Sequence, residues 1–132
     1  MAKFGNKIHY LPALLWSLVI LAFTSIPDLS PPSLGFTWQD KFEHFAAYSL
    51  FGAAITYGNI RSNKYRAFLG AVIFCSVFGV LDEIHQHWIH GRSTDPYDWV
   101  ADTSGAFIGS LIVFLLRNYW MARFKSKTTA PK

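Results

Sequence analysis

The chain has 132 residues, of which 52% are apolar and only 15% are charged, and its net charge is +4. This length allows one domain, and so small a charged fraction is unusual for a soluble globular protein. Cys75 is the single cysteine, which excludes a disulfide within these residues.

The charges are segregated along the sequence. All eight acidic residues fall within 28–43 and 82–102, and ten of the twelve basic residues fall elsewhere. If the apolar segments cross a membrane, one side carries ten bases (+10). The other carries eight acids and two bases (−6), and the sum is the net +4. Because basic loops of membrane proteins stay in the cytoplasm, this pattern favours an integral membrane protein and not a nucleic-acid-binding one.

The first apolar segment runs from about 8 to 26. Lys3 and Lys7 precede it, as in a signal peptide, but no small-x-small cleavage site follows its apolar core. We therefore expect a retained helix. Three prolines within 27–33 end the segment.

Three further segments follow at about 40–59, 66–88 and 98–117, each near the roughly 20 residues that cross a bilayer. Residues 1–122 are thus predicted to form one transmembrane domain, and the basic tail 123–132 to be cytoplasmic and disordered. Aromatic residues fall at both expected boundaries, as in membrane proteins: Trp38, Trp88 and Trp99 outside, and Tyr65, Tyr119 and Trp120 inside.

The predicted fold is an all-α bundle of four transmembrane helices in the cell membrane, with both termini cytoplasmic. The loops 27–40 and 86–98 then lie outside. A soluble bundle is the alternative, but the uncharged runs Leu11–Phe23 and Ala67–Leu81 disfavour it.

Polar residues recur at helical spacing where three of these segments meet the outer boundary. At about 100° per residue, positions four apart share one helix face. Such sets are Asp40, His44 and Tyr48; Asp82 and Gln86, beside Glu83; and Asp98 and Asp102, continued by Gly105 and Gly109. Glycines permit close helix approach, which would turn the last face into the bundle or toward a second chain in a homo-oligomer.

Ionisable groups at membrane depth are costly, usually face the bundle interior and mark functional sites. We therefore predict an outward-facing polar pocket. Its residues are Asp40, Lys41, His44, Tyr48, Asp82, Glu83, Gln86, Arg92, Asp98 and Asp102. Arg92 would clamp a carboxylate or a phosphate, and His44 between carboxylates would shuttle a proton. The structural alternatives are ion pairs that fix helix register and helix caps at Asp40 and Asp98.

Other chemistries fit less well. Glu83, His87 and His90 share a face if the third helix continues, yet they lack the His-Glu-x-x-His zinc spacing, so no metal ligands and no cofactor are expected. Ser93 and Thr94 lie near His90 without a strained nucleophile elbow, and there is no phosphate-binding glycine loop or dinucleotide fingerprint.

Two blocks resemble motifs of the VanZ-like membrane protein family. Residues 40–48, DKFEHFAAY, match Asp-Lys-x-x-His-Phe-x-x-Tyr, and the second block comprises Asp82-Glu83 with Gln86, Gly91-Arg92, Asp98, Gly105 and Gly109. The blocks occur in order and with the family's spacing over about 40–109. Asp102 stands where the family often has Asn, and His90 where Pro is common. The resemblance implies a small membrane protein of the cell envelope, of a family whose founding type is associated with resistance to the glycopeptide antibiotic teicoplanin.

Three functions follow as hypotheses. The first is a non-enzymatic protein that binds a membrane lipid, a lipid-linked envelope precursor or a glycopeptide in the polar pocket. The second is a membrane-embedded enzyme that acts on a lipid headgroup, with His44, Glu83 or Asp82 in acid–base roles and Arg92 stabilising charge. The third is a structural or assembly protein. A transporter is disfavoured because the polar residues gather at one end and no string of ionisable groups crosses the inner half.

Overall fold

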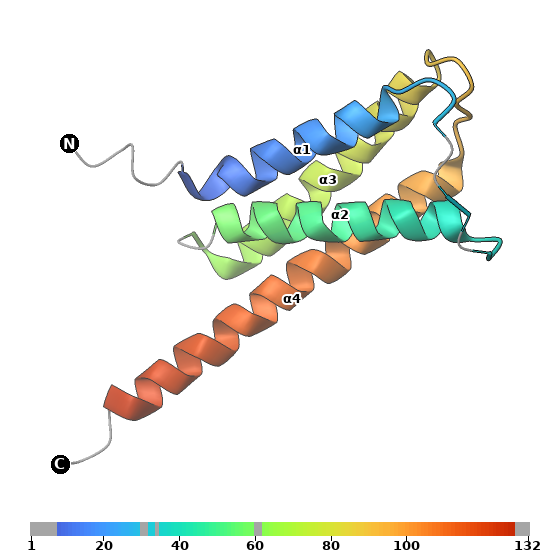
Figure 1. The fold of residues 1–132 in the computed structure, drawn as a ribbon. Coiled ribbons are helices and arrows are strands. Elements are labelled where there is room, and N and C mark those ends of the chain that lie inside the picture. Colours follow the sequence, from blue (N-terminus) through green and yellow to red (C-terminus); the bar gives the residue numbers. More distant parts are fainter. Residues whose placement is uncertain (1–7, 30–31, 34, 60–61, 129–132) are drawn as a thin grey trace.

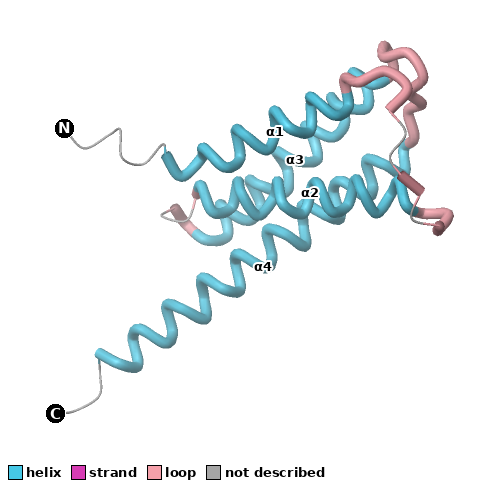
Figure 2. Tube along the Cα trace, in the orientation of Figure 1, coloured by secondary structure: helices cyan, strands magenta, loops and turns pink. Residues whose placement is uncertain are grey.

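The structure is a computed structural model that describes residues 8–29, 32–33, 35–59 and 62–128, with the backbone alone for 122–128. Its elements are a 3₁₀ turn η1 (Ile8–Tyr10) and four helices: α1 (Leu11–Thr24), α2 (Gln39–Gly58), α3 (Lys64–Gln86) and α4 (Pro96–Thr128). The described residues contain no strand (Figure 2), which confirms the predicted all-α fold and its four helices.

Helix boundaries follow from local chemistry. Pro12 lies in the first turn of α1, where its missing N–H removes no helical hydrogen bond. Asn63 caps α3, since its Oδ1 accepts hydrogen bonds from the backbone N–H groups of Tyr65 and Arg66 at 3.0 and 3.3 Å. After α3, Gly91 takes a positive φ of 73° that favours glycine.

The α1–α2 and α3–α4 connections lie together at one end of the molecule, and the start of α1, the α2–α3 connection and the far part of α4 lie toward the other (Figure 1). We call these the acidic end and the basic end. At the basic end, Arg117 Nη2 donates to the carbonyl oxygen of Ser62 at 3.0 Å, and Lys64 Nζ donates to Asn118 Oδ1 at 3.2 Å. The charge segregation read along the sequence is therefore also a segregation in space.

The closest helix contact is between α2 and α4. A Cβ atom added at Gly105 would meet the backbone of Phe45, and one added at Gly109 would meet the backbone of Ser49. Gly52 of α2 faces the backbone of Ala106 in the same way. The Gly105/Gly109 face thus packs inside the bundle, against α2 of the same chain. Association of two chains, the other use expected for this face, would need a different surface.

Two described helices are long and apolar enough to cross a membrane: α3, and α4 over Pro96–Met121. Four such helices were expected, and by length and composition two of the described helices qualify. The apolar helix Ile8–Thr24 is shorter, about 26 Å at 1.5 Å per residue. In α2, the first two turns carry Asp40, Lys41, Glu43 and His44, which lowers its hydropathy.

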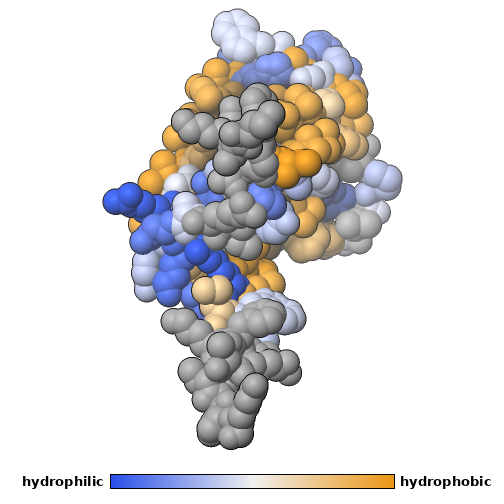
Figure 3. Space-filling model, turned by 90° about the vertical axis from the view of Figure 1, so that its left-hand side faces the viewer, coloured by the Kyte–Doolittle hydropathy of each residue, from blue (hydrophilic) through white to orange (hydrophobic). Residues whose placement is uncertain are grey.

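Polar residues are buried beside the apolar core, while large apolar side chains are exposed on the surface. Buried polar residues are Thr56, Asp82, Gln86, Asp98, Asp102 and Ser110. Large apolar side chains are instead exposed along α1, α3 and α4, among them Leu14, Leu18, Ile73, Val77, Ile112 and Leu116. Figure 3 shows broad hydrophobic areas, separated by hydrophilic ones, on the face nearest the termini. Soluble monomers rarely expose apolar patches this extensive.

Helix α4 is longer than expected. It continues past 117 to Thr128, and its last part extends beyond the other helices (Figure 1). The tail predicted to be disordered from 123 is therefore helical through Thr128, and its residues 129–132 lie outside the described part. The reason is local, because Arg117–Lys127 contains no Gly or Pro and includes good helix formers.

Candidate functional site

Lys41 is the centre of an ion-pair network at the acidic end. Its Nζ lies 3.0 Å from Asp40 Oδ2, 2.6 Å from Asp95 Oδ2 and 2.5 Å from Asp98 Oδ1. The ammonium group thereby joins α2 to the first turn of α4 and to the residue before it. Its hydrogen bond holds the pKa of the Asp95 carboxyl, which lies outside the helices, below the usual range.

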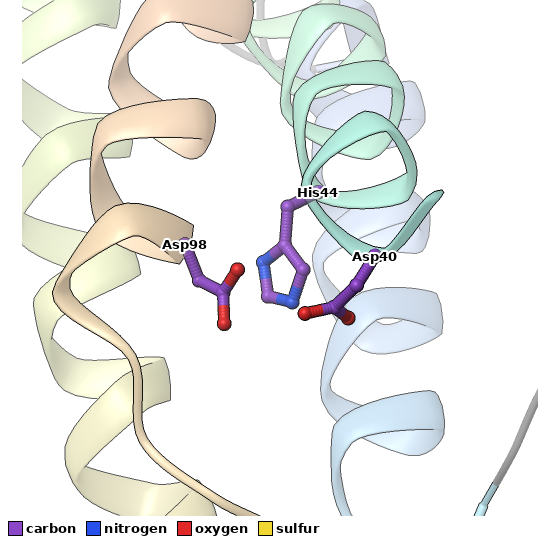
Figure 4. A group of neighbouring side chains, drawn as sticks. All are labelled: Asp40, His44 and Asp98. Atoms are coloured by element: carbon purple, nitrogen blue, oxygen red, sulfur yellow. The ribbon is translucent and has the colours of Figure 1, made fainter. Parts of the chain in front are cut away.

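His44, one turn further along α2, contacts α4 more deeply. Its Nδ1 lies 3.0 Å from Oδ1 of Asp102, whose side chain is 1% exposed. Figure 4 shows the His44 ring between the carboxylates of Asp40 and Asp98. One imidazole therefore lies among carboxylates from both α2 and α4.

Asp82 and Gln86 form the α3 part of the site, and both side chains are buried. Gln86 Nε2 donates to Asp82 Oδ2 at 3.3 Å, while Thr24 Oγ1 of α1 donates to Asp82 Oδ1 at 2.8 Å. Glu83 faces the α3–α4 loop, where its Oε2 accepts the backbone N–H of Asp95 at 3.1 Å. These bonds connect α3 to α1 and to the start of α4.

Arg92 contacts the end of α1. Its Nη2 donates to the carbonyl oxygen of Phe23 at 2.6 Å, a favourable place for a cation because the C-terminus of a helix carries partial negative charge. The backbone N–H of Asp28 donates to the carbonyl oxygen of His90 at 3.2 Å in the adjoining loops. No ion pair joins Arg92 to a carboxylate within the described residues, so the carboxylate clamp expected of Arg92 is not formed there.

A cavity of about 480 Å³ opens beside this network, between α1 and α2, and we call it the amphiphilic cavity. One part of its lining is apolar: Trp16, Val19, Ile20, Phe23, Leu29, Pro32 and Ala47. The other part is polar: Thr24, Asp40, Glu43, His44, Tyr48, Asp82 and Arg92. The combination suits a ligand with an apolar portion and a polar headgroup.

The ten residues predicted for the pocket thus divide into two groups. Asp40, His44, Tyr48, Asp82 and Arg92 line the cavity. Lys41, Glu83, Gln86, Asp98 and Asp102 form the network at the acidic end, outside the cavity lining. The structure brings both groups together, since Asp40, His44 and Asp98 offer ligand atoms within 4.8 Å of one another, as do His44, Glu83 and Asp102.

Among the cavity residues that the sequence pattern did not predict, three carry polar side-chain atoms: Trp16, Thr24 and Glu43. Trp16 and Thr24 belong to α1, which carries neither motif block, so only a polar Thr at the outer end of an apolar segment signalled a role. Glu43 lies within the first motif block, at a position that the motif leaves open. It lies one turn from Asp40 and accepts a hydrogen bond from Gln39 Nε2 at 2.7 Å.

Some buried polar atoms of the site have no hydrogen-bond partner in the described part of the chain. They include Tyr48 Oη, Glu83 Oε1 and Asp102 Oδ2. A buried polar group left unsatisfied costs about 1–3 kcal/mol, and more when charged. So many at one place indicate a site whose arrangement is not explained by folding alone.

The family model for VanZ/LLP1 matches residues 2–117, which include α1, α2, α3 and most of α4. The chain therefore belongs to this family, in agreement with the motif blocks at the acidic end. No curated protein and no solved structure matches the chain significantly.

Proposed function

We propose that this member of the VanZ/LLP1 family is a membrane protein of the cell envelope that binds a lipid with a hydroxyl-rich headgroup, such as a lipid-linked sugar precursor. The observation that carries the proposal is the amphiphilic cavity, whose apolar wall comes mainly from α1 and whose polar wall comes mainly from α2.

The exposed apolar surface and the buried acids support the membrane setting. Exposed leucine, isoleucine and phenylalanine side chains would contact lipid, while buried aspartates face the bundle interior. In the proposed topology all four helices cross the cell membrane, with the basic end and both termini in the cytoplasm. The amphiphilic cavity then opens near the outer boundary, where lipid headgroups lie.

The polar wall supports a hydroxylated headgroup. Asp40, Glu43 and Asp82 present carboxylates that accept hydrogen bonds from sugar hydroxyls, and Arg92 supplies a cation for a phosphate linkage. The apolar wall offers Trp16, whose Nε1–H is bonded to the carbonyl oxygen of Ala47 at 2.8 Å, which fixes its ring. A lipoglycopeptide antibiotic presents the same chemistry, so resistance through capture of such a molecule falls within the proposal.

The test is binding to the purified protein in detergent, measured by native mass spectrometry. We expect a glycolipid to bind more tightly than a phosphatidylcholine with the same acyl chains. Glu43→Gln should weaken glycolipid binding, because it removes a cavity acceptor with little change of shape. Asp28→Asn is the matched control, since Asp28 lies at the acidic end outside the cavity lining. Equal affinity for both lipids, or equal loss in both variants, would contradict the proposal.

A second candidate is an enzyme acting on the same headgroup, and the contact between His44 and Asp102 favours it. A buried carboxylate that holds one ring nitrogen of a histidine orients the ring for acid–base work. Product formation from a labelled glycolipid, lost in His44→Ala but kept in Asp28→Asn, would establish it. Recovery of unchanged glycolipid from the wild-type protein would leave binding as the function.

A further inference from the structure

His44, Glu83 and Asp102 come from three different helices and meet at one place. One ligand atom of each, an imidazole nitrogen or a carboxylate oxygen, lies within 4.8 Å of the other two. His44 Nδ1 and Asp102 Oδ1 lie 3.0 Å apart. Two ligands at about 2.1 Å from an octahedral metal ion lie about 3.0 Å apart, so the spacing suits a shared ion.

Acceptor atoms at this place are left without donors. The Asp102 side chain is 1% exposed, and its Oδ2 has no hydrogen-bond partner among the described residues. Glu83 Oε1 is buried and likewise without a partner there, although Glu83 Oε2 accepts the Asp95 N–H. A buried carboxylate oxygen needs a donor or a cation, and these two oxygens belong to the same cluster.

The neighbouring carboxylates are already matched. Asp40, Asp95 and Asp98 share the ammonium of Lys41, and Asp82 accepts from Thr24 and Gln86. The other possible metal cluster, Asp40 with His44 and Asp98, is weaker for this reason, since two of its three members pair with Lys41. Glu83 and Asp102 therefore keep buried carboxylate oxygens that have neither a donor nor a cation among the described residues.

We propose that His44, Glu83 and Asp102 bind one divalent transition-metal ion of the Mn²⁺ or Zn²⁺ type. One imidazole and two carboxylates form a mixed nitrogen and oxygen set, which favours these ions over Mg²⁺ and Ca²⁺. The sequence expectation of no metal considered Glu83, His87 and His90 along one helix. The site proposed here instead joins Glu83 to residues of two other helices.

The proposal stands on the cluster alone and not on the lipid-binding function. Its link to that function is His44, which also lines the amphiphilic cavity. A cation at this site would offset the carboxylates of the polar wall and place positive charge next to a headgroup phosphate.

The test is metal binding by the purified protein in detergent, with any affinity tag removed and metals stripped by a chelator. We expect one equivalent of Mn²⁺ or Zn²⁺ by elemental analysis after desalting, and a changed Mn²⁺ paramagnetic resonance spectrum on binding. Mg²⁺ at equal concentration should not displace it. Removing a residue that only hydrogen-bonds to a metal ligand weakens metal binding about 10–100-fold. Glu83 is itself a proposed ligand, so Glu83→Gln should weaken metal binding at least about tenfold.

Matched controls separate the site from other histidines and acids. His87→Ala and Asp28→Asn change exposed residues at the same end and should keep the full equivalent. Asp102→Asn is the second isosteric ligand variant, for use if Glu83→Gln does not elute as folded protein. Less than about a tenth of an equivalent in the wild type, or equal losses in His87→Ala and Glu83→Gln, would overturn the proposal, even if glycolipid binding is intact.

Discussion

His44 Nδ1 on α2 and Asp102 Oδ1 on α4 lie 3.0 Å apart, on the two helices that approach each other most closely. The contact is possible because Gly105 and Gly109 bring the α4 backbone against that of α2. The glycines and the polar pair are thus parts of one interface, in which the close packing positions the site.

Two substitutions of Asp102 distinguish the effect of its charge from the effect of its hydrogen bond to His44. Asp102→Asn keeps an acceptor for His44, and we expect a stability within about 1 kcal/mol of the wild type. Asp102→Leu leaves His44 Nδ1 without this partner and should lower the free energy of unfolding by about 1–3 kcal/mol. Thermal unfolding in detergent measures both, and a greater loss in the asparagine variant would argue against this role of the contact.

The glycines of α4 offer a direct test of the helix packing. Gly105→Ala and Gly109→Ala place a methyl group against the backbone of Phe45 and Ser49, which cannot move aside as a side chain can. We expect losses of about 1–3 kcal/mol in unfolding free energy. Gly70→Ala on α3 is the control, because nothing lies within 4 Å of its added Cβ. It should stabilise α3 by up to about 1 kcal/mol. Equal effects at all three positions would refute the packing.

Gly91 and Gly35 both have positive φ angles, 73° and 82°, but differ in surroundings. A Cβ at Gly91 would meet Asp28, whereas one at Gly35 meets nothing within 4 Å. Gly35→Ala should therefore cost only the conformational strain, about 1–2 kcal/mol, and Gly91→Ala should cost more. Unfolding midpoints of the two variants measure the difference. A smaller effect at Gly91 would mean that the loop of Gly91 does not contact the loop of Asp28.

The proposed topology is measurable by cysteine labelling. Cys75 is 0% exposed and should not react in the folded protein. In whole cells, Thr94→Cys should react with a membrane-impermeant maleimide added outside, because residue 94 lies at the acidic end. Ser62→Cys, at the basic end, should react only after the membrane is permeabilised. Labelling of both positions in intact cells, or of Ser62→Cys alone, would contradict the orientation.

The sequence was sufficient for the helices and for the motif faces. Apolar runs bounded by Gly, Pro and charged residues located each helix to within a few residues, except at the end of α4. Four-residue spacing placed Asp40 and His44 on one face of α2, and the glycines identified the α4 face that packs inside. These features are local, so one helix at a time is enough to see them.

Partners between helices were harder to predict. Lys41 was assigned to a ligand but is bound by three carboxylates, and Arg92 contacts the end of α1. The contribution of Trp16 and Thr24 depends on how α1 packs against α2 and α3. This packing is determined by contacts between segments distant in sequence, and the periodicity of a single segment gives no information about such contacts.

The most direct test of the central claim is quenching of Trp16 fluorescence by a bound lipid. A variant with Trp16 as the single tryptophan, its other four replaced by phenylalanine, would be titrated with a glycolipid that carries brominated acyl chains. The cavity as described predicts saturable quenching that an unbrominated glycolipid reverses and an excess of phosphatidylcholine does not. Quenching that rises in proportion to any brominated lipid, without saturation or reversal, would show that Trp16 meets only bulk lipid and that the amphiphilic cavity binds no headgroup.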